Sequence, residues 1–160
     1  ESSGLHYVPG ICPPGWNCPK NLAEPLLKNK IKFIASARDI FSDISSTAKT
    51  NMSGLKGVSL IYPEKVFEDK LIHFPSNFNP TNPIDRALKI IEQGGILGVK
   101  AHITKRKYDY VAFDGLDEQY RNYLDLLFKE IENKFGDSIW WTSMNEISQI
   151  LSQEEKSGSS

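Results

Sequence analysis

Short apolar runs, rich in β-branched and aromatic residues, recur along the chain and are separated by polar, glycine- or proline-containing turns. Runs of this kind are typical of strands that are covered on one or both faces. The pattern predicts strands over residues 5–11, 31–36, 58–62, 71–74, 96–103 and 138–142.

Between these runs, apolar positions follow the spacing of amphipathic helices. The best delimited helix has Asn82 as its cap and Pro83 at its first position, and it ends at Gly94-Gly95. The sequence therefore predicts helices over 20–29, 83–93, 117–135 and 144–151.

Strands that alternate with helices are expected to form right-handed βαβ units and a mainly parallel sheet. The predicted fold class is α/β, and the number of units corresponds to an incomplete (β/α) barrel. Half a barrel exposes two sheet edges, so either residues outside this chain complete the sheet or the domain is an open α/β sandwich. We expect residues 1–151 to form this unit and residues 152–160 to form a flexible tail.

The 160 residues, of which 39% are hydrophobic and 24% charged, suffice for one domain whose core needs neither a metal nor a disulfide. The net charge of −1 gives no electrostatic case for binding nucleic acid, and no apolar stretch is long enough to span a membrane. The chain starts without an initiator methionine or a signal peptide, so we expect it to be the interior of a longer protein. Its localisation stays open, with secretion or the cell envelope as options.

Histidines and cysteines limit the chemistry that the chain can perform alone. His6, His73 and His102 lie far apart in the sequence, so no metal site is expected within this chain. Cys12 and Cys18 have a C-x5-C spacing that fits neither a redox CxxC motif nor a four-ligand zinc site. Two alternatives remain for this pair: a disulfide, if the protein is exported, or two unpaired thiols of which one is part-buried.

Four segments carry a resemblance to a known family. The sequence Pro-Pro-Gly-Trp at 13–16 follows the first strand, and residues 31–36 form the next strand. Residues 98–102 form a late strand that ends on a histidine, and residues 139–147 lead from two tryptophans into the last helix. In order and spacing, these segments resemble the C-terminal half of the polysaccharide deacetylase family, the NodB-homology carbohydrate esterases, over residues 5–150.

The resemblance implies an irregular (β/α) barrel and metal-dependent removal of acetyl groups from N- or O-acetylated glycans. Such hydrolysis needs an activated water and a stabilised oxyanion, and a divalent ion such as zinc supplies both. The family's Asp-Asp and His-x-x-x-His motifs are absent here, and Cys12 stands where the family usually has an arginine. The metal would therefore be bound only in the full-length enzyme, by a missing N-terminal half or another subunit that completes the sheet, and this chain alone would be inactive.

The family's motifs also imply roles for single residues. His102 would be the general acid, because imidazole titrates near neutral pH. The residues expected to bind substrate are Pro14, Trp16, Asp39, His73 and Trp141.

Each of these roles has a structural alternative. His102 could make a single backbone hydrogen bond at a strand end, His73 could be an ordinary loop residue, and Asp39 could pair with Arg38 at the surface. If residues 138–142 form a strand, Trp141 and its neighbour point to opposite faces, so one of the two would lie in the core.

Three functions are compatible with the sequence. The leading one is a portion of a deacetylase. The second is a non-catalytic domain with a deacetylase-like fold that binds carbohydrate or another subunit, and the third is an unrelated α/β domain. The first two require Trp16 and His102 to open onto the same side of the molecule.

Overall fold

The computed structural model describes residues 7–52, 54–102, 106–107, 110–111 and 115–157, together with Gly4. For 106–107, 110–111 and 154–157, the description is limited to the backbone. His6, which was predicted to lie in the first strand, is outside the described residues.

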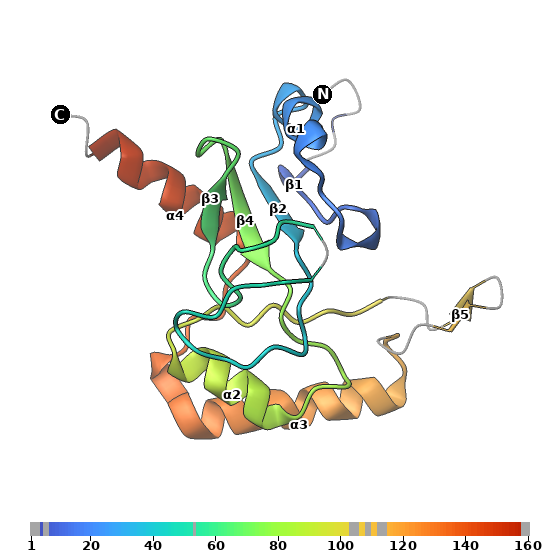
Figure 1. The fold of residues 1–160 in the computed structure, drawn as a ribbon. Helices are drawn as coiled ribbons and strands as arrows, with labels where there is room; N and C mark the ends of the chain where they lie inside the picture. The colour runs from blue at the N-terminus through green and yellow to red at the C-terminus, as the bar shows by residue number, and fades with distance from the viewer. Residues whose placement is uncertain are drawn as a thin grey trace.

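A four-stranded mixed sheet forms the centre of the fold (Figure 1). The sheet order is β1-β2-β4-β3, where the strands are β1 (Gly10–Ile11), β2 (Phe33–Ser36), β3 (Glu64–Val66) and β4 (Leu71–Pro75). β1, β2 and β4 are parallel, with Phe33 opposite Ile72, whereas β3 is antiparallel to β4. A separate two-stranded ribbon consists of β5 (Arg106–Lys107) and β6 (Tyr110–Val111).

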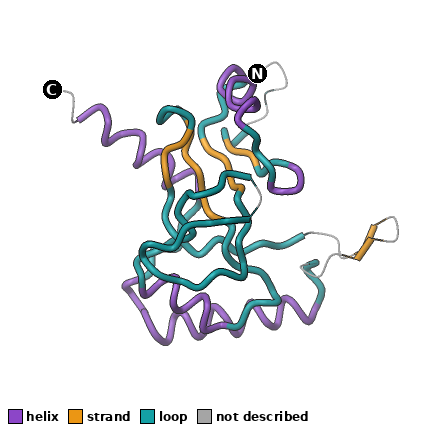
Figure 2. The backbone as a smooth tube through the Cα atoms, viewed as in Figure 1, coloured by secondary structure: helices purple, strands orange, loops and turns teal. Residues whose placement is uncertain are grey.

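Four α-helices accompany the sheet: α1 (Ala23–Lys28), α2 (Ile84–Glu92), α3 (Glu118–Phe135) and α4 (Met144–Ser157). Short 3-10 turns lie at Pro14–Trp16, Lys20–Leu22 and Gly136–Ser138. α2 and α3 lie together beyond the carboxyl ends of the strands, while α4 runs from this end past the sheet (Figure 2). None of the described helices is long and apolar enough to cross a lipid bilayer.

Three apolar clusters hold these layers together, one of which joins Leu60 and Ile61 to Ile90 of α2. On one face of the sheet, Phe33, Ile72 and Phe74 pack against the apolar side of α4, which presents Met144 and Ile147. The second cluster joins α2 to α3 through the buried residues Phe78, Ala87, Leu127 and Ile131. The helical periodicity of the sequence thus identifies the buried faces of these helices.

The α/β class is confirmed, and so are several elements. The runs at 31–36 and 71–74 are the buried strands β2 and β4, and the helix at 117–135 is α3. Asp117 caps α3, because its carboxylate accepts a hydrogen bond of 2.9 Å from Tyr120 N. α4 begins at Met144, as predicted, but continues past 151 to Ser157. The barrel stays a prediction, since the strands described form an open mixed sheet.

The strands predicted over 58–62, 96–103 and 138–142 are wrong for the described residues. These segments contain only isolated bridges, such as Phe78 with Val99, or irregular backbone. Their apolar residues are covered by loops and helices instead of being paired in a ladder, and a pattern of burial does not distinguish the two situations. The first predicted strand shortens to Gly10–Ile11 among the residues described.

The predicted cap of α2 is also wrong. α2 begins at Ile84 with Pro83 at the cap position, and no side chain caps it. Asn82 instead accepts a hydrogen bond from Asn79 N at 3.0 Å and donates one to Ile40 O at 2.8 Å. Its amide therefore fastens the loop before α2 to the loop after β2.

Candidate functional site

A cavity of about 430 Å³ lies at the carboxyl end of β1 and β2, and we call it the carboxyl-end cavity. It is formed by the end of β1 and the loop after it, the sheet face of β2, the extended segment 98–102 and the first residue of α4. The residues that give it its chemical character are Cys12, Trp16, Phe33, Lys100, His102 and Met144.

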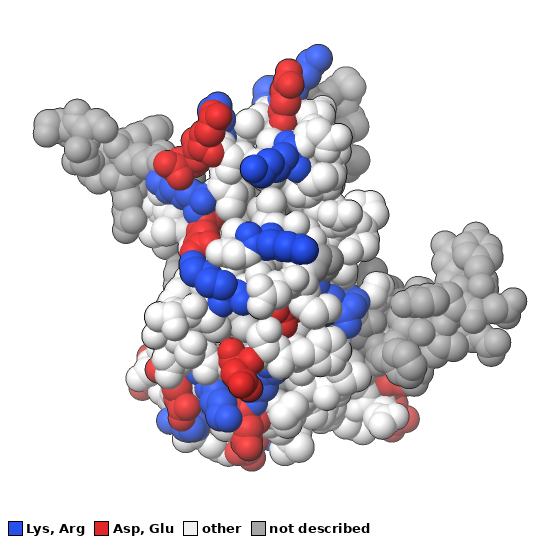
Figure 3. Space-filling view, in the orientation of Figure 1, with Lys and Arg blue, Asp and Glu red and all other residues white. Residues whose placement is uncertain are grey.

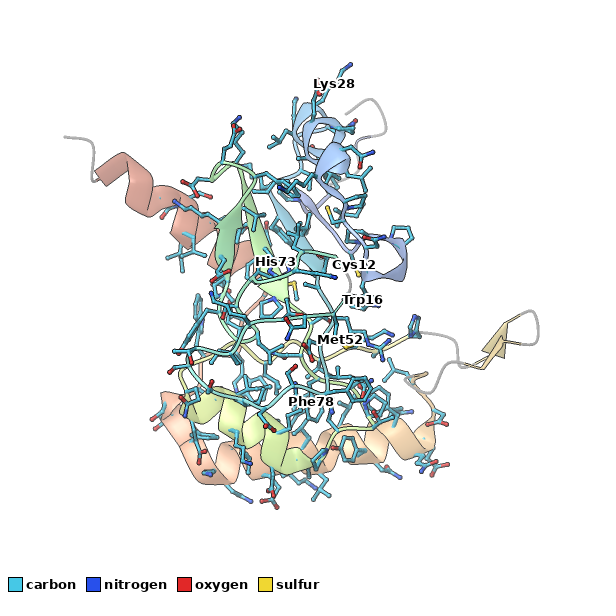
Figure 4. The ribbon with its side chains drawn as sticks, viewed as in Figure 1. Cys12, Trp16, Lys28, Met52, His73 and Phe78 are labelled. Atoms are coloured by element: carbon cyan, nitrogen blue, oxygen red, sulfur yellow. The ribbon has the colours of Figure 1, made fainter. Side chains whose placement is uncertain are left out.

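The loop after β1 positions Trp16. Trp16 N donates a hydrogen bond of 2.9 Å to Pro13 O, and both Gly15 and Trp16 have a positive φ, 62° and 60°. This tight turn brings the indole onto the apolar cluster of the sheet. The turn is held from outside by Gly54, where a Cβ would lie 2.6 Å from Trp16 O, so the loops after β1 and β2 interlock. Figure 4 labels Trp16 and Cys12, which line the same cavity.

The segment 98–102 brings a cation and an imidazole to the same cavity. Lys100 Nζ lies 5.4 Å from the centroid of the Trp16 ring, a cation–π distance. The segment is fixed because Lys100 N donates to Phe78 O at 3.0 Å and Tyr120 Oη donates to Lys100 O at 2.5 Å. His102 is exposed, and its carbonyl accepts a hydrogen bond of 2.9 Å from Leu116 N.

Cys12 faces the same cavity as a free thiol. Burial raises the pKa of the Cys12 thiol, and the positive charge of Lys100 offsets only part of this effect. The thiol therefore stays protonated at neutral pH and is a poor nucleophile. Cys18 is buried and also free, which agrees with the two-thiol alternative.

The cavity combines an aromatic face, an ammonium group and an imidazole. An indole face suits the C–H face of a sugar ring, and an imidazole can form hydrogen bonds to its hydroxyls. No group of three His, Cys, Asp or Glu side chains in the described part of the chain could hold a metal ion. The side chains that line this cavity thus suit a hydroxylated ligand.

The structure brings together two of the predicted site residues, Trp16 and His102. Pro14 lies in the turn beside Trp16, where it is exposed and does not line the cavity. Asp39, His73 and Trp141 lie elsewhere.

Asp39 is fully buried and organises the loop after β2. Its carboxylate accepts hydrogen bonds from Ser42 N at 3.0 Å and Ser42 Oγ at 2.8 Å, and from Phe41 N at 3.2 Å. Longer ones, at 3.4 Å, come from Thr50 and Asn51. Burial acts to raise the pKa of Asp39, but these hydrogen bonds together lower it below its usual value. The Asp39 carboxylate is therefore engaged within its own loop and does not line the carboxyl-end cavity.

His73 lies inside β4 and is fully buried (Figure 4). Its Nε2 donates a hydrogen bond of 2.9 Å to Ser36 O, while Nδ1 has no hydrogen-bond partner among the described residues. Burial lowers the pKa of His73, and the hydrogen bond to Ser36 and the charge of Glu64 oppose this only in part. The imidazole is neutral and does not reach the cavity.

Trp141 lines a different, apolar cavity of about 460 Å³. Its ring packs edge-to-face on Phe128 with 5.4 Å between centroids. Trp140 and Trp141 are 55% and 54% exposed, so the expectation that one of them is core is wrong, because no strand forms there. The apolar cavity shares Gly98, Val99 and Met144 with the carboxyl-end cavity.

Lys100 is a site residue that the sequence prediction missed. A signal existed, because residues two positions apart in an extended segment face the same side, and Lys100 stands two positions before His102. The sequence prediction also missed the role of Asn77 in holding the loops around the site, and no pattern in the sequence indicates that role. Its buried amide donates to Leu60 O at 3.1 Å and Ile96 O at 2.8 Å and accepts from Gly98 N at 2.9 Å.

Lys, Arg, Asp and Glu side chains are mixed over the face shown in Figure 3. Such mixing creates no strong field of one sign on this face. No family model, no curated protein and no solved structure matches the chain.

Proposed function

We propose that the carboxyl-end cavity binds an acetylated glycan and that this chain is the groove-bearing part of a carbohydrate deacetylase with an incomplete (β/α) barrel. The observation that carries the proposal is that Trp16 and His102 line one cavity although they are far apart in the sequence. The sequence resemblance gives these two residues complementary roles, one in stacking on the sugar and one in proton transfer.

The side chains of this chain would bind the glycan and move a proton. The Trp16 indole would pack on the apolar face of a sugar ring. Lys100, beside that indole, favours negative charge developing in the cavity. The His102 imidazole would give a proton to the leaving amine of an N-acetyl group or the leaving alcohol of an O-acetyl group.

In this proposal a catalytic metal and the general base would be bound by residues other than the described ones, among which no metal-binding group is found. A preceding segment of a longer protein, or another subunit, would supply them. β1 supports this arrangement, since it is a parallel strand at the edge of its sheet, and parallel strands are normally paired and covered.

A second candidate is a non-catalytic domain that binds carbohydrate or another subunit through the same cavity. It is favoured by the lack of a metal-binding group in the described part of the chain and by Cys12 at the position where the family has an arginine. The metal content of the longest soluble polypeptide that includes these residues separates the two candidates. Stoichiometric zinc, nickel or cobalt supports the deacetylase, and its absence supports the binding domain.

The glycan-binding claim is tested by calorimetric titration of the chain with N-acetylglucosamine oligomers. We expect Trp16→Ala to weaken binding roughly two- to tenfold, the usual contribution of one aromatic stacking contact. Trp140→Ala is the matched control, because it removes a half-exposed indole outside the carboxyl-end cavity, and it should leave the affinity unchanged. Equal affinities for the native chain and Trp16→Ala would exclude the stacking role.

The proton-transfer claim is tested in the longest polypeptide that shows deacetylase activity. His102→Ala should lower turnover by roughly 10²–10⁴-fold, as expected for the loss of a general acid. Metal content should stay the same, because His102 belongs to no metal-binding group of the described chain. Unaltered turnover would remove His102 from the mechanism.

A further inference from the structure

The apolar cavity of about 460 Å³ has a volume typical of small-molecule sites. Residues of α2, α3 and α4 line it, together with the segments 94–99 and 138–143 that connect these helices. None of the described residues that line it is charged. A charged ligand would lose its hydration there without gaining an ionic partner, so the lining suits an uncharged, apolar group.

The surface that this cavity offers to a ligand is mainly aromatic and aliphatic. Trp140 and Trp141 contribute two indoles, each more than half exposed. The hydroxyl groups of Thr142 and Ser143 are engaged at the first turn of α4. Thr142 Oγ1 donates to Glu146 Oε2 at 2.5 Å, and Ser143 Oγ accepts from Glu146 N at 3.2 Å. These two hydroxyls therefore belong to the start of the helix, and the indoles dominate what remains.

The apolar cavity adjoins the carboxyl-end cavity, because Gly98, Val99 and Met144 line both. Of these residues, Gly98 has no side chain and Met144 has a flexible one. Gly98 is held in place, since its backbone N donates to Asn77 Oδ1 at 2.9 Å. A sugar ring that packs on Trp16 in the carboxyl-end cavity thus has an uncharged, apolar space next to it.

We propose that the apolar cavity binds a hydrocarbon chain carried by the sugar in the carboxyl-end cavity. The ligand is then a glycan with an alkyl chain, or with an acyl chain longer than acetyl. This inference rests on the proposed function, which places the sugar ring on Trp16. The chain passes Met144 and lies against the indoles of Trp140 and Trp141, where its burial contributes affinity in proportion to its length.

An NMR titration of the chain, which measures millimolar affinities, tests the ligand class. The ligands are N-acetylglucosamine, N-hexanoylglucosamine, hexyl N-acetylglucosaminide and 1-hexanol. We expect at least one of the two chain-bearing sugars to bind roughly ten- to hundredfold tighter than N-acetylglucosamine, since each buried methylene contributes up to about fourfold. The tighter of the two shows whether the chain is joined through the nitrogen or through the anomeric carbon. Equal affinities of N-acetylglucosamine and both chain-bearing sugars, or 1-hexanol binding as tightly as they do, would overturn the proposal.

The three tryptophans locate the ligand, because one indole lines the carboxyl-end cavity and two line the apolar cavity. N-acetylglucosamine should shift the indole N–H signal of Trp16, and the chain-bearing sugars should also shift those of Trp140 and Trp141. A shift of the Trp16 signal alone with all three sugars would overturn this proposal and leave glycan binding in place. If no ligand shifts the Trp16 signal, glycan binding in the carboxyl-end cavity is contradicted, and this proposal with it.

Variants test the contact with the chain. Trp141→Ala should weaken binding of the preferred chain-bearing sugar roughly three- to tenfold and leave the affinity for N-acetylglucosamine unchanged. Phe41→Ala is the matched control, because Phe41 is 72% exposed and lines neither cavity, and it should change neither affinity. If Trp141→Ala behaves like Phe41→Ala while both variants keep the native melting temperature, the hydrocarbon chain does not occupy the apolar cavity.

Discussion

At the level of single residues, burial decides what a polar side chain can do in this protein. His73 and His102 are the same residue type and were both expected at the site, but only His102 is exposed in a cavity. Asp39 likewise has a carboxylate that could bind a ligand, but this carboxylate accepts hydrogen bonds from its own loop instead. The residue type therefore predicts the chemistry available, and the position in the packed core determines whether a ligand can use it.

His73 makes stability depend on pH in a defined range. Because burial lowers its pKa in the folded state, the unfolded chain takes up a proton first as pH falls below about 6.5. The free energy of unfolding should therefore be unaffected by His73 above that pH and decrease below it, by at most about 1.4 kcal/mol per pH unit. Chemical denaturation at several pH values between 7.5 and 5 measures this slope. His73→Gln should remove its contribution, while the matched His102→Gln should retain it. Equal slopes for native protein and His73→Gln would contradict the assignment.

At the level of elements, the sequence predicts correctly the helices and strands whose apolar pattern is compatible with only one type of secondary structure. α3 combines a long apolar stripe with a capping aspartate and a terminating glycine, and β2 and β4 are short runs buried on both faces. The segments 58–62 and 96–103 are as apolar as β2 and β4. In their described parts, however, side chains hydrogen-bond to the backbone where a strand would have a neighbouring strand. Ser59 Oγ accepts from Tyr62 N at 2.9 Å, and the Asn77 amide bridges the backbone of Leu60, Ile96 and Gly98.

The candidate site was likewise predictable only where its residues lie in segments with a clear local sequence pattern. The turn at 13–16 and the histidine at the end of 98–102 have local signals in the sequence, and the structure places both at one cavity. The burial of Asp39 and His73 depends on strand pairing and on loop contacts between residues far apart in the sequence. For example, Thr50 and Asn51 donate hydrogen bonds to the Asp39 carboxylate. No local sequence pattern predicts such contacts.

The cap of α3 gives a prediction at this level. Asp117→Ala removes the acceptor for Tyr120 N and should lower the free energy of unfolding by about 1 kcal/mol. Asp117→Asn keeps an oxygen acceptor and should retain most of the stability. Asp125→Ala, in the exposed middle of the same helix, is the matched control for loss of an acidic side chain and should be neutral or slightly stabilising, because alanine is the better helix former. Urea unfolding measures all three, and equal destabilisation by Asp117→Ala and Asp125→Ala would show that the cap is not the cause.

At the level of the whole molecule, one guanidinium of the helical layer contacts two of the loops at the carboxyl end of the sheet. Arg86, in α2, donates to Ser42 O at 2.6 Å and Asp39 O at 3.1 Å in the loop after β2, and to Asn77 O at 3.0 Å after β4. The planar guanidinium can serve all three carbonyls at once, which a lysine cannot. The loops that follow β2 and β4 are therefore fixed relative to each other and to α2, although few strand contacts connect these regions.

This connection predicts that Arg86 contributes more to stability than its partly exposed position suggests. Arg86→Met keeps much of the side-chain volume but leaves three carbonyls without their donor, and we expect a loss of about 2–4 kcal/mol in the free energy of unfolding. For a chain of this size that corresponds to a melting temperature lower by roughly 5–15 °C. Arg86→Lys should recover only part of the loss, because an ammonium group cannot reproduce the three-way geometry. Arg121→Met, on the exposed side of α3, is the matched control and should change stability by less than about 0.5 kcal/mol. If full recovery by lysine were observed, positive charge alone would explain the contribution of Arg86, and the loops would not depend on its hydrogen bonds for their arrangement.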